Sequence, residues 1–425
     1  TSSRHNSLIL MTKKFVLNHQ LKEITSFFEN SSKNLFITGK AGTGKSSLIR
    51  YIKKNTKKNI VLLAPTAIAA LNINAKTIHS FFNFPFHIIS KTDIKKHFNK
   101  RLINKIDTML IDEASMLRPD IIDAIDLTLQ VTRENKESFG GIQMIIVGDL
   151  FQLPPVITND EIEIMNKLYP NGNFFFNSNV FQNTNFLKFE LTEVFRQEDQ
   201  RLIDLLDKAR SASLGDHDLL EFNKRLVDDD WIPPEEVLTL STNNHKVNSI
   251  NAMNLKNIDS REYVYHAEIE GKYNTAPVDA ELKIKVGAQV MLVKNGENWV
   301  NGTLAIVDDL TKDSIHIKIK DEIYKLEKEK WEKFEYKISN NKIIPSVSAT
   351  FIQYPLKLAW AATIHKCQGQ TFDKVMIDMD HGAFAHGQTY VALSRVVSLD
   401  GLFLRKSLKN EDFIFNPAIK TFLEH

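Results

Sequence analysis

One short segment constrains the fold of this chain more than any other. Residues 39–46 read Gly-Lys-Ala-Gly-Thr-Gly-Lys-Ser, between the apolar run 35–38 and Leu48, Ile49 and Ile52 at helical spacing. This order predicts a strand, a glycine-rich loop and a helix, an arrangement in which backbone N–H groups and a helix N-terminus surround a phosphate. The alternative is a glycine-rich turn that matches by chance. The complete eight-residue pattern in its strand–helix context disfavours it.

The residue types in this loop suit a nucleoside triphosphate. Gly42 and Gly44 let the main chain approach the phosphates where a Cβ atom would clash. Lys45 can reach the β- and γ-phosphates, and the Ser46 hydroxyl can ligate Mg²⁺. Together with Thr43, these residues form the predicted phosphate and metal site.

Polar residues follow several apolar runs that predict the strands of an open α/β sheet. The runs are residues 35–38, 60–64, 108–111, 143–147 and 186–191. Ligands bind at the carboxyl ends of such strands. Asp112 and Glu113, after the third run, are therefore candidates for holding Mg²⁺ and polarising a water, and Gln152, after the fourth, for contacting the γ-phosphate. An acidic turn that arose by chance is the alternative for the carboxylate pair.

Two arginines outside these strands are candidates for stabilising the charge that develops on the γ-phosphate. If Arg196 and Arg395 reach it, they belong to the opposite wall of a cleft whose closure depends on that phosphate. The alternative for each is a surface salt bridge. Cys367 beside His365 is not expected to be a nucleophile, because adjacent residues on a helix do not face each other and no orienting group is evident.

The composition limits the remaining possibilities. A length of 425 residues predicts two to four domains. The 54 basic and 52 acidic residues give a formal charge of +2, so any nucleic-acid footprint must be local. The single cysteine excludes an internal disulfide and fits a reducing compartment, and no apolar run approaches the length that spans a bilayer. Met11 resembles a natural start, so residues 1–10 are left out of the fold prediction.

The residue pattern changes twice in the second half of the chain. Residues 237–240 open a second α/β segment. From about residue 255, short strands with turn signals predict a small antiparallel barrel; Ile315, Ile317 and Ile319 alternate there with polar residues. The α/β pattern resumes near residue 350, so we interpret the barrel as an insertion.

A basic stretch and a group of aromatic residues in the first half leave two interpretations open. Residues 91–105 hold six Lys or Arg residues against one Asp, which fits either a solvated helix face or a surface that tracks phosphates. Nearby Phe81, Phe82, Phe84 and Phe86 could stack bases, but we expect most of them to lie in the core.

Motifs follow one another in a fixed order over nearly the whole chain from about residue 15 to 404. They are residues 17–20, 39–46, 64–67, 77–80, 112–115, 148–155, 194–197, 287–295 with 300–302, 363–370 and 390–395. This ordered set closely resembles the superfamily 1B DNA helicases of the petite-integration-frequency family, with RecD-type helicases as relatives.

The resemblance implies an α/β fold with two RecA-like parallel-sheet domains. A short wedge would be inserted in the first, and a small antiparallel β-barrel in the second. The expected boundaries are residues 11–185 for the first domain with the wedge at about 80–105, residues 186–254 and 350–425 for the second, and residues 255–349 for the barrel.

The resemblance also implies an activity. It is that of an ATP- and Mg²⁺-dependent helicase that moves 5′-to-3′ on single-stranded DNA and unwinds duplex, forked or G-quadruplex DNA, in repair, recombination or telomere maintenance. The implied partners are single-stranded and forked DNA, with no membrane and a monomer in isolation. The implied location is the cytoplasm for a bacterial-type form, or the nucleus or mitochondrion for a eukaryotic one.

Matched residue by residue, the resemblance implies individual roles. Gln20 would contact adenine, and Gly369 would belong to the nucleotide site. Gln152, Arg196 and Arg395 would sense the γ-phosphate. The DNA path would be lined by Pro65, Thr66, His79, Asn244, Thr363, His365 and Lys366.

Two other classes of function remain open from the residues alone. One is a phosphotransferase acting on a small molecule, which the two-lobed organisation and the paired arginines disfavour. The other is an ATP-gated nucleic-acid clamp that binds DNA without unwinding it.

Overall fold

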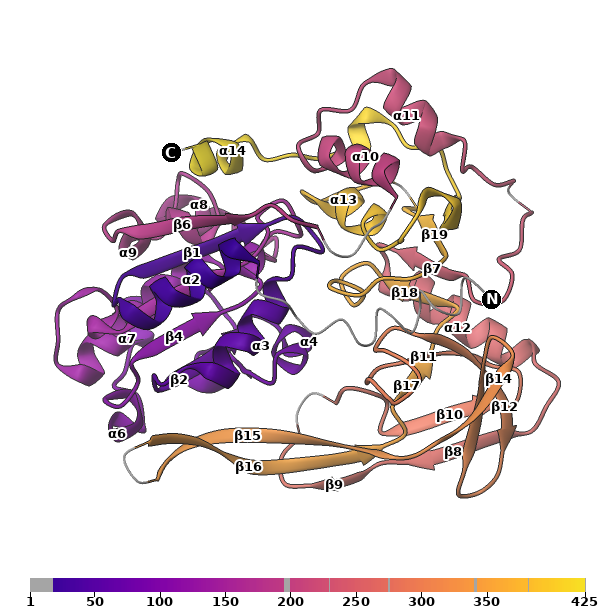
Figure 1. Cartoon of the computed structure of the whole chain (residues 1–425), viewed down its shortest axis with the longest axis horizontal. Helices are drawn as coiled ribbons and strands as arrows, with labels where there is room; N and C mark the ends of the chain where they lie inside the picture. The colour runs from indigo at the N-terminus through magenta and orange to yellow at the C-terminus, as the bar shows by residue number, and fades with distance from the viewer. Residues whose placement is uncertain are drawn as a thin grey trace.

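The structure is a computed structural model that describes residues 18–194, 199–228, 230–273, 276–339, 342–380 and 382–424. Figure 1 shows one α/β unit at the left, a second at the upper right, and antiparallel strands below the second. Both α/β units are built on parallel sheets, so the predicted fold class is confirmed.

The first sheet has six parallel strands in the order β3-β2-β4-β5-β1-β6. They are β1 (Asn34–Gly39), β2 (Ile60–Ala64), β3 (Lys76–Thr77), β4 (Thr108–Ile111), β5 (Gln143–Val147) and β6 (Phe186–Leu191). All five strands predicted from apolar runs are present. β3 is only two residues long, so no apolar run reveals it.

Apolar cores cover both faces of this sheet. Around it lie α2 (His19–Asn30), α3 (Lys45–Asn55), α4 (Ala67–Asn72), α5 (Ile78–Phe82), α6 (Lys100–Ile103), α7 (Pro119–Arg133), α8 (Ile162–Leu168) and α9 (Asn179–Gln182). Successive residues of a strand point to opposite faces. Leu35 and Ile37 therefore pack with Leu48 of α3, whereas Phe36 lies in the main core with Ile122 of α7. This packing fixes the loop between β1 and α3 at the carboxyl edge of the sheet.

The second sheet has four parallel strands in the order β18-β7-β19-β20. They are β7 (Leu238–Ser241), β18 (Ala361–Thr363), β19 (Val375–Asp378) and β20 (Leu402–Leu404). The later helices are α10 (Gln200–Arg210), α11 (Asp216–Asn223), α12 (Asn244–Asn257), α13 (Gln388–Leu393) and α14 (Pro417–Glu424). Single 3₁₀ turns are η1 (Lys91–Asp93), η2 (Ala114–Met116), η3 (Ser138–Gly141), η4 (Phe175–Asn177), η5 (Leu399–Gly401) and η6 (Asn410–Asp412).

The structure corrects the expected division between the two α/β domains. β6 pairs with β1 along its whole length, so the first sheet continues past residue 185 to Leu191. Residues 417–424 were expected in the second domain, but α14 lies against the first, where the Phe422 ring stacks on Phe176 with centroids 4.3 Å apart (Figure 1). Both errors have one cause: hydrophobic pattern identifies an element but not the sheet against which it packs.

The predicted antiparallel insertion consists of three sheets. A five-stranded sheet runs β14-β13-β12-β11-β17, β10 pairs with β8, and β16 lies between β15 and β9. The strands are β8 (Glu262–His266), β9 (Glu268–Glu270), β10 (Glu281–Lys285), β11 (Gln289–Leu292), β12 (Leu304–Leu310), β13 (Ile315–Ile319), β14 (Glu322–Leu326), β15 (Glu329–Ser339), β16 (Lys342–Gln353) and β17 (Leu356–Leu358). Because β17 pairs with β11, the insertion extends beyond its expected end at residue 349.

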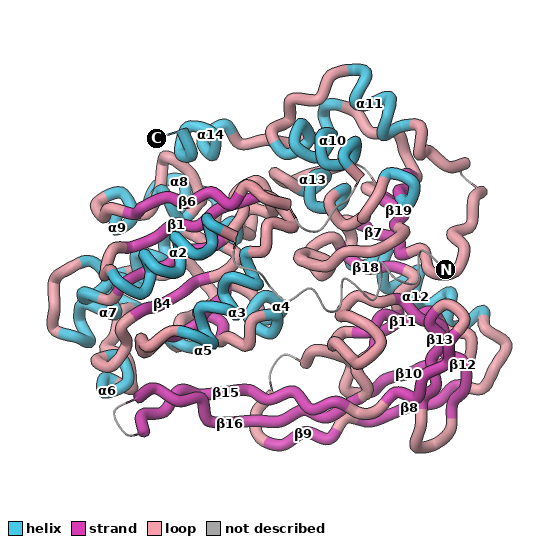
Figure 2. The backbone as a smooth tube through the Cα atoms, in the orientation of Figure 1, coloured by secondary structure: helices cyan, strands magenta, loops and turns pink. Residues whose placement is uncertain are grey.

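The long hairpin β15–β16 leaves this insertion and reaches the first domain, which the sequence did not predict (Figure 2). The Leu62 N–H donates to Tyr336 Oη at 3.3 Å, and the Ile343 N–H donates to Asn59 Oδ1 at 3.3 Å. The Tyr336 ring also stands edge-on to Phe81 at 6.0 Å. We call these interactions the hairpin contact.

The region expected to form the wedge, residues 80–105, consists of the end of α5, η1, α6 and connecting loops. Phe81, Phe82 and Phe84 are buried and Phe86 is 86% exposed, as expected for a group that is mostly core. In the basic stretch, Lys96 and Lys100 both pair with Glu134, at 3.0 and 2.7 Å. Two of its lysines therefore share one carboxylate of the protein, which balances one of their two charges.

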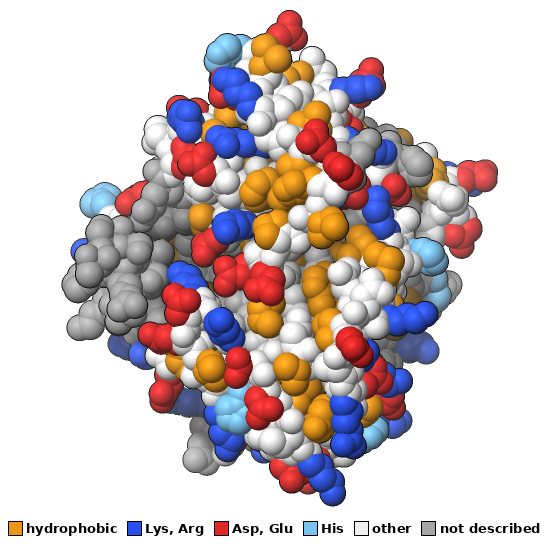
Figure 3. Space-filling view, turned by 90° about the vertical axis from the view of Figure 1, so that its right-hand side faces the viewer, with side chains coloured by type: hydrophobic (Ala, Val, Ile, Leu, Met, Phe, Trp, Pro, Cys, Tyr) orange, Lys and Arg blue, Asp and Glu red, His pale blue; other side chains and the backbone are white. Residues whose placement is uncertain are grey.

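The described surface and helices agree with the composition. Basic and acidic side chains are interspersed on the face in Figure 3, as expected for a formal charge of +2. Among the described residues, no helix has the length and apolar character needed to cross a membrane.

Candidate nucleotide and DNA site

The phosphate loop has the backbone that its sequence predicts. Gly42 and Gly44 have φ angles of 84° and 85°, in the left-handed region that favours glycine, and Gly44 is the N-cap of α3. The Thr43 hydroxyl donates to the Lys40 carbonyl at 2.9 Å and braces the turn. Ser46 lies on the first turn of α3 and is exposed.

Lys45 lies folded inside this loop. Its Nζ donates to the carbonyls of Gly39 at 2.6 Å and Lys40 at 2.8 Å. Burial lowers the pKa of Lys45, while the charges of nearby Asp149 and Glu113 act in the opposite direction. A half-buried cation at the positive end of a helix is the arrangement that an anionic phosphate would complete.

Asp112 and Glu113 stand at the carboxyl end of β4, beside this loop. Burial raises the pKa of Asp112 to about 6, and burial followed by the charge of Asp112 raises the pKa of Glu113 to about 7. Glu113 also has a φ of 54°, a strained conformation for a residue other than glycine. A pair of crowded, desolvated carboxylates fits a divalent cation, which would supply the missing positive charge.

Asp149 is a fully buried acceptor shared by both domains. Its Oδ1 accepts Arg210 Nη2 of α10 at 3.0 Å, and its Oδ2 accepts the Tyr390 hydroxyl of α13 at 3.2 Å. The Ala41 N–H of the phosphate loop in turn donates to Tyr390 Oη at 3.1 Å. The second domain therefore touches the phosphate loop through the Tyr390 hydroxyl and also through Asp207 of α10, which pairs with Lys40.

Backbone packing brings α13 to this position. A Cβ atom built on Gly387, the N-cap of α13, would lie 2.2 Å from the Phe151 carbonyl, so this approach requires glycine. His386 Nε2 also lies 3.0 Å from the Leu150 carbonyl. Close backbone contact thus seats the second domain on residues 148–155 of the first.

Gln368 makes a second polar link across the cleft. Its Nε2 donates to Glu113 Oε2 at 3.1 Å and to Gln152 Oε1 at 3.0 Å. Gln152 and Gln368 are only 6% and 7% exposed. The predicted water-activating residue and the predicted γ-phosphate sensor therefore meet one amide from the opposite domain.

Arg395 is almost completely buried in the second domain, at 1% exposure. Its guanidinium donates to the Val391 and Gln370 carbonyls, each at 2.8 Å, and to the Ser394 hydroxyl at 2.6 Å. Its positive charge opposes the rise in the pKa of Glu113 that burial causes, so the guanidinium acts on the cleft from its far wall. Arg196 lies outside the described residues.

Gln20 and Cys367 occupy contrasting places. Gln20 Nε2 donates to the Glu190 carbonyl near the end of β6, the strand paired with β1, so its amide lies close to the phosphate loop. Cys367 is completely buried, and burial raises the pKa of its thiol to about 11. A protonated, enclosed thiol agrees with the expectation that it is no nucleophile.

The predicted DNA-contacting residues form two groups. Pro65 and Thr66 follow β2, and His79 lies in α5 after the neighbouring β3, so they share one edge of the first sheet. There the His79 ring stacks on exposed Phe86 with centroids 5.0 Å apart. The second group lies at the ends of the paired strands β7 and β18 of the second sheet: Asn244, Thr363, His365 and Lys366.

Burial favours the uncharged form of the two histidines in these groups. Burial is the main cause that lowers the pKa of both His79 and His365. They would therefore offer hydrogen bonds or ring faces to DNA, and the exposed Lys366 would offer charge.

Known proteins share this arrangement over the length of the chain. The sequence model of the PIF1-like helicases matches residues 16–214. The ATP-dependent DNA helicase Pif1 of Bdellovibrio bacteriovorus is 32% identical over 88% of this chain and 84% of its own length. The zebrafish ATP-dependent DNA helicase PIF1 is 32% identical over 88% of this chain, which spans only 58% of that relative. The crystal structure of Bacteroides Pif1 with ADP-AlF4 is 34% identical over 97% of each chain, with a TM-score of 0.89.

The chain belongs to the PIF1-like helicase family. Its named relatives are ATP-dependent DNA helicases, so the predicted family and enzyme class are confirmed. Unliganded Bacteroides Pif1 superposes on this PIF1-like chain with a TM-score of 0.88. Pif1 structures bound to single-stranded DNA, or described as unwinding forked DNA by two coordinating helicases, superpose with TM-scores of 0.71.

Sequence reasoning missed several polar residues of this PIF1-like cleft. Gln368 and Tyr390 lie inside motifs that were recognised, but nothing in the sequence showed that their side chains cross the cleft. Asp149 also lies within a recognised motif. No sequence pattern pointed to Arg210, because it is the last residue of an ordinary amphipathic helix and lies 61 residues from its partner Asp149.

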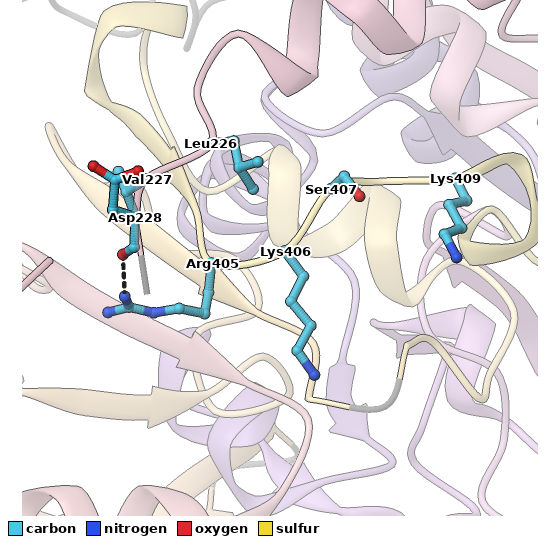
Figure 4. Close-up of a pocket in the computed structure, with 7 residues that line it drawn as sticks. All are labelled: Leu226, Val227, Asp228, Arg405, Lys406, Ser407 and Lys409. Atoms are coloured by element: carbon cyan, nitrogen blue, oxygen red, sulfur yellow. Dashed lines mark hydrogen bonds between the residues drawn. The ribbon is translucent and has the colours of Figure 1, made fainter. Parts of the chain in front are cut away.

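A surface pocket of about 470 Å³ lies apart from these residues, at the end of β20 (Figure 4). Its Arg405 donates to the Asp228 carbonyl at 2.9 Å, the bond drawn in the figure. The pocket is lined by Leu226, Val227, Asp228, Arg405, Lys406, Ser407 and Lys409. None of these is a predicted site residue.

Proposed function

We propose that this PIF1-like helicase is a 5′-to-3′ motor that moves on single-stranded DNA and unwinds duplex, forked and G-quadruplex DNA. The observation that carries the proposal is the cleft between the two parallel-sheet domains. The Gln368 amide meets Glu113, and the Tyr390 hydroxyl meets Asp149, so residues of both domains surround the phosphate loop. A ligand bound there can alter the relation between the domains, which a motor requires.

In this proposal, Lys45 and the N–H groups at residues 42–46 hold the phosphates. Ser46 and Asp112 hold Mg²⁺, and Glu113 accepts the proton of the attacking water. ATP and Mg²⁺ supply the phosphoanhydride bond and the charge that polarises it. Gln20 would hydrogen-bond the adenine, and Gly369 would border the nucleotide.

Gln152, Arg196 and Arg395 are proposed to respond to the γ-phosphate from opposite walls. Arg395 is supported by its place in the second domain and by its electrostatic effect on Glu113. Arginine stabilises the charge that phosphoryl transfer spreads over the γ-phosphate. Loss of that charge after hydrolysis would then loosen the cleft.

The two groups that follow β2–β3 and β7–β18 are proposed to line the DNA. They are Pro65, Thr66 and His79 in the first domain and Asn244, Thr363, His365 and Lys366 in the second. Stacking and phosphate contacts read little sequence, so binding should be sequence-tolerant and should weaken steeply with salt. A monomer acting in the cytoplasm remains a prediction.

The test compares unwinding of duplexes with a 5′ or a 3′ single-stranded tail, with ATP turnover measured in parallel with and without DNA. We expect strand release from the 5′-tailed substrate and turnover that DNA stimulates. Binding without release would favour a clamp, and turnover that ignores DNA would favour a phosphotransferase. Release from the 3′-tailed substrate alone would reverse the proposed polarity. A folded G-quadruplex with a 5′ tail tests the last substrate class.

A further inference from the structure

One loop joins the proposed DNA path to the water-activating carboxylate. Thr363 ends β18, and His365 and Lys366 follow it among the proposed DNA contacts. Two residues later, the Gln368 amide donates to Glu113 Oε2 and Gln152 Oε1 across the cleft. DNA contacts and a contact with Glu113 are therefore separated by only a few residues of one loop.

This loop is tightly held, so its two ends should move together. The Cys367 N–H donates to the carbonyls of Thr363 and Ile364, each at 3.2 Å. Arg395 Nη1 donates to the carbonyls of Gln370 at 2.8 Å and Cys367 at 3.4 Å. The loop behaves as a small rigid turn, and a displacement at Lys366 would be passed to Gln368.

The Gln368 amide occupies one of the two carboxylate oxygens that Glu113 could offer to water. A carboxylate oxygen that already accepts an N–H is a weaker base and has one lone pair fewer for water. The same amide also holds Gln152 Oε1, so it fixes two groups that face the phosphates. In this arrangement Glu113 is restrained.

We propose that Gln368 is a positioning residue that restrains ATP hydrolysis in the absence of DNA. DNA bound by Thr363, His365 and Lys366 would displace the loop and release Glu113. This rests on the proposed function, because it requires that the loop touch DNA. Because DNA must break the Gln368–Glu113 bond in order to bind, the same bond must also weaken DNA binding.

The test is Gln368→Ala in the full chain. A hydrogen bond to a charged group contributes enough free energy to change a rate by about tenfold. Loss of the amide should therefore raise ATP turnover without DNA by about tenfold. It should also tighten binding to a fluorescent oligothymidine, measured without nucleotide, by about three- to tenfold. The DNA-stimulated rate should stay near that of the wild type. Damage to the fold would lower these quantities, whereas the proposal requires two of them to rise.

Gln130→Ala is the matched control. Gln130 Nε2 donates to both carboxylate oxygens of Asp126, at 3.0 and 2.8 Å, within α7 and away from the cleft. It removes the same kind of bond, an amide donor to a carboxylate, and should change neither basal turnover nor DNA binding. If Gln368→Ala misfolds, Gln368→Met keeps the length of the side chain without the donors.

Two results would overturn the inference. Equal loss of basal and DNA-stimulated turnover in Gln368→Ala would assign Gln368 to productive alignment instead of restraint. Unchanged basal turnover and unchanged DNA affinity would show that the bond couples nothing. A wild-type chain whose turnover ignores DNA would contradict the proposed function itself, and that result is visible before any variant is made.

Discussion

The nucleotide cleft and the hairpin contact both join the first domain to the rest of the chain, and their chemistry differs. The nucleotide cleft is joined by charges and directed hydrogen bonds, including Lys40–Asp207 at 2.5 Å and Arg210–Asp149 at 3.0 Å. The hairpin contact combines two hydrogen bonds between uncharged groups with apolar and aromatic packing. Tyr336 stands edge-on to Phe81, and Ile338 packs against the main core.

The difference indicates which contact a ligand can control. A phosphate or a metal ion can replace hydrogen bonds and ion pairs one for one, because it offers the same kinds of interaction. It offers nothing to an apolar contact, whose strength depends on buried area. We therefore expect cleft substitutions to change turnover and hairpin substitutions to change local stability.

Arg395→Ala should have the largest effect. Removal of an arginine that stabilises the phosphoryl-transfer transition state lowers kcat by about 10³-fold or more. ATP binding, measured with a fluorescent analogue, should persist. Since Arg395 also holds the Gln370 carbonyl, Arg395→Lys serves as the variant that keeps the charge. Loss of nucleotide affinity with kcat retained would argue instead for a role in ground-state binding.

Lys45→Ala should have the second-largest effect on turnover. Loss of one preorganised donor to the phosphates lowers kcat by about 10²- to 10³-fold. DNA binding without nucleotide should be largely intact, because Lys45 lies inside the phosphate loop. Lys54→Ala, an exposed change in the last turn of the same helix, is the control. Undiminished turnover in Lys45→Ala would contradict the assignment of the loop.

The sequence predicted the phosphate loop well because its chemistry is local. Eight consecutive residues determine the turn, and the φ angles of Gly42 and Gly44 confirm it. The five longer strands of the first sheet could be predicted equally well, since each is an apolar run. β3 was not, because two residues carry no periodicity.

The hairpin and the links across the cleft could not be predicted in the same way. β15 consists of half-buried and exposed residues and carries many charges, so its hydrophobic pattern does not indicate which distant element it contacts. The Leu62–Tyr336 contact joins residues 274 positions apart, and the Glu113–Gln368 contact joins residues 255 apart. Such pairs depend on how domains dock, which single-chain periodicity does not encode.

Glu113→Gln should stabilise the nucleotide-free protein at pH 8 by about 1–2 kcal/mol. Each pKa unit corresponds to about 1.4 kcal/mol. The expected gain is smaller than the full shift in pKa would give, because the half-buried carboxylate keeps part of its hydration. The pKa of Glu113 rises from 4.5 to about 7 on folding. The folded state therefore holds this proton more tightly, and ionisation lowers stability as the pH rises from about 4.5 to 7. Glutamine cannot ionise, so it removes this cost above pH 7.

Thermal unfolding at pH 8 and pH 5 checks this prediction. The variant should melt at a higher temperature than the wild type at pH 8, and the two should nearly coincide at pH 5. Equal gains at both values would mean that packing, not charge, explains the change. Turnover should fall strongly, so this cleft residue would trade stability for function.

Tyr336→Phe should have the smallest effect, and it tests the hairpin side of the comparison. The hydroxyl accepts one N–H, from Leu62, so its loss should cost about 1 kcal/mol and leave the ring packing in place. Hydrogen exchange over residues 329–353 should speed up about fivefold at 1 kcal/mol, with ATP turnover unchanged. Tyr354→Phe removes a hydroxyl that donates to the Asp313 carbonyl inside the insertion, and should leave exchange in β15 and β16 near Tyr336 unaltered. If Tyr336→Phe instead lowered turnover as strongly as a cleft variant, the hairpin would be coupled to the nucleotide and the division between polar and apolar contacts would be wrong.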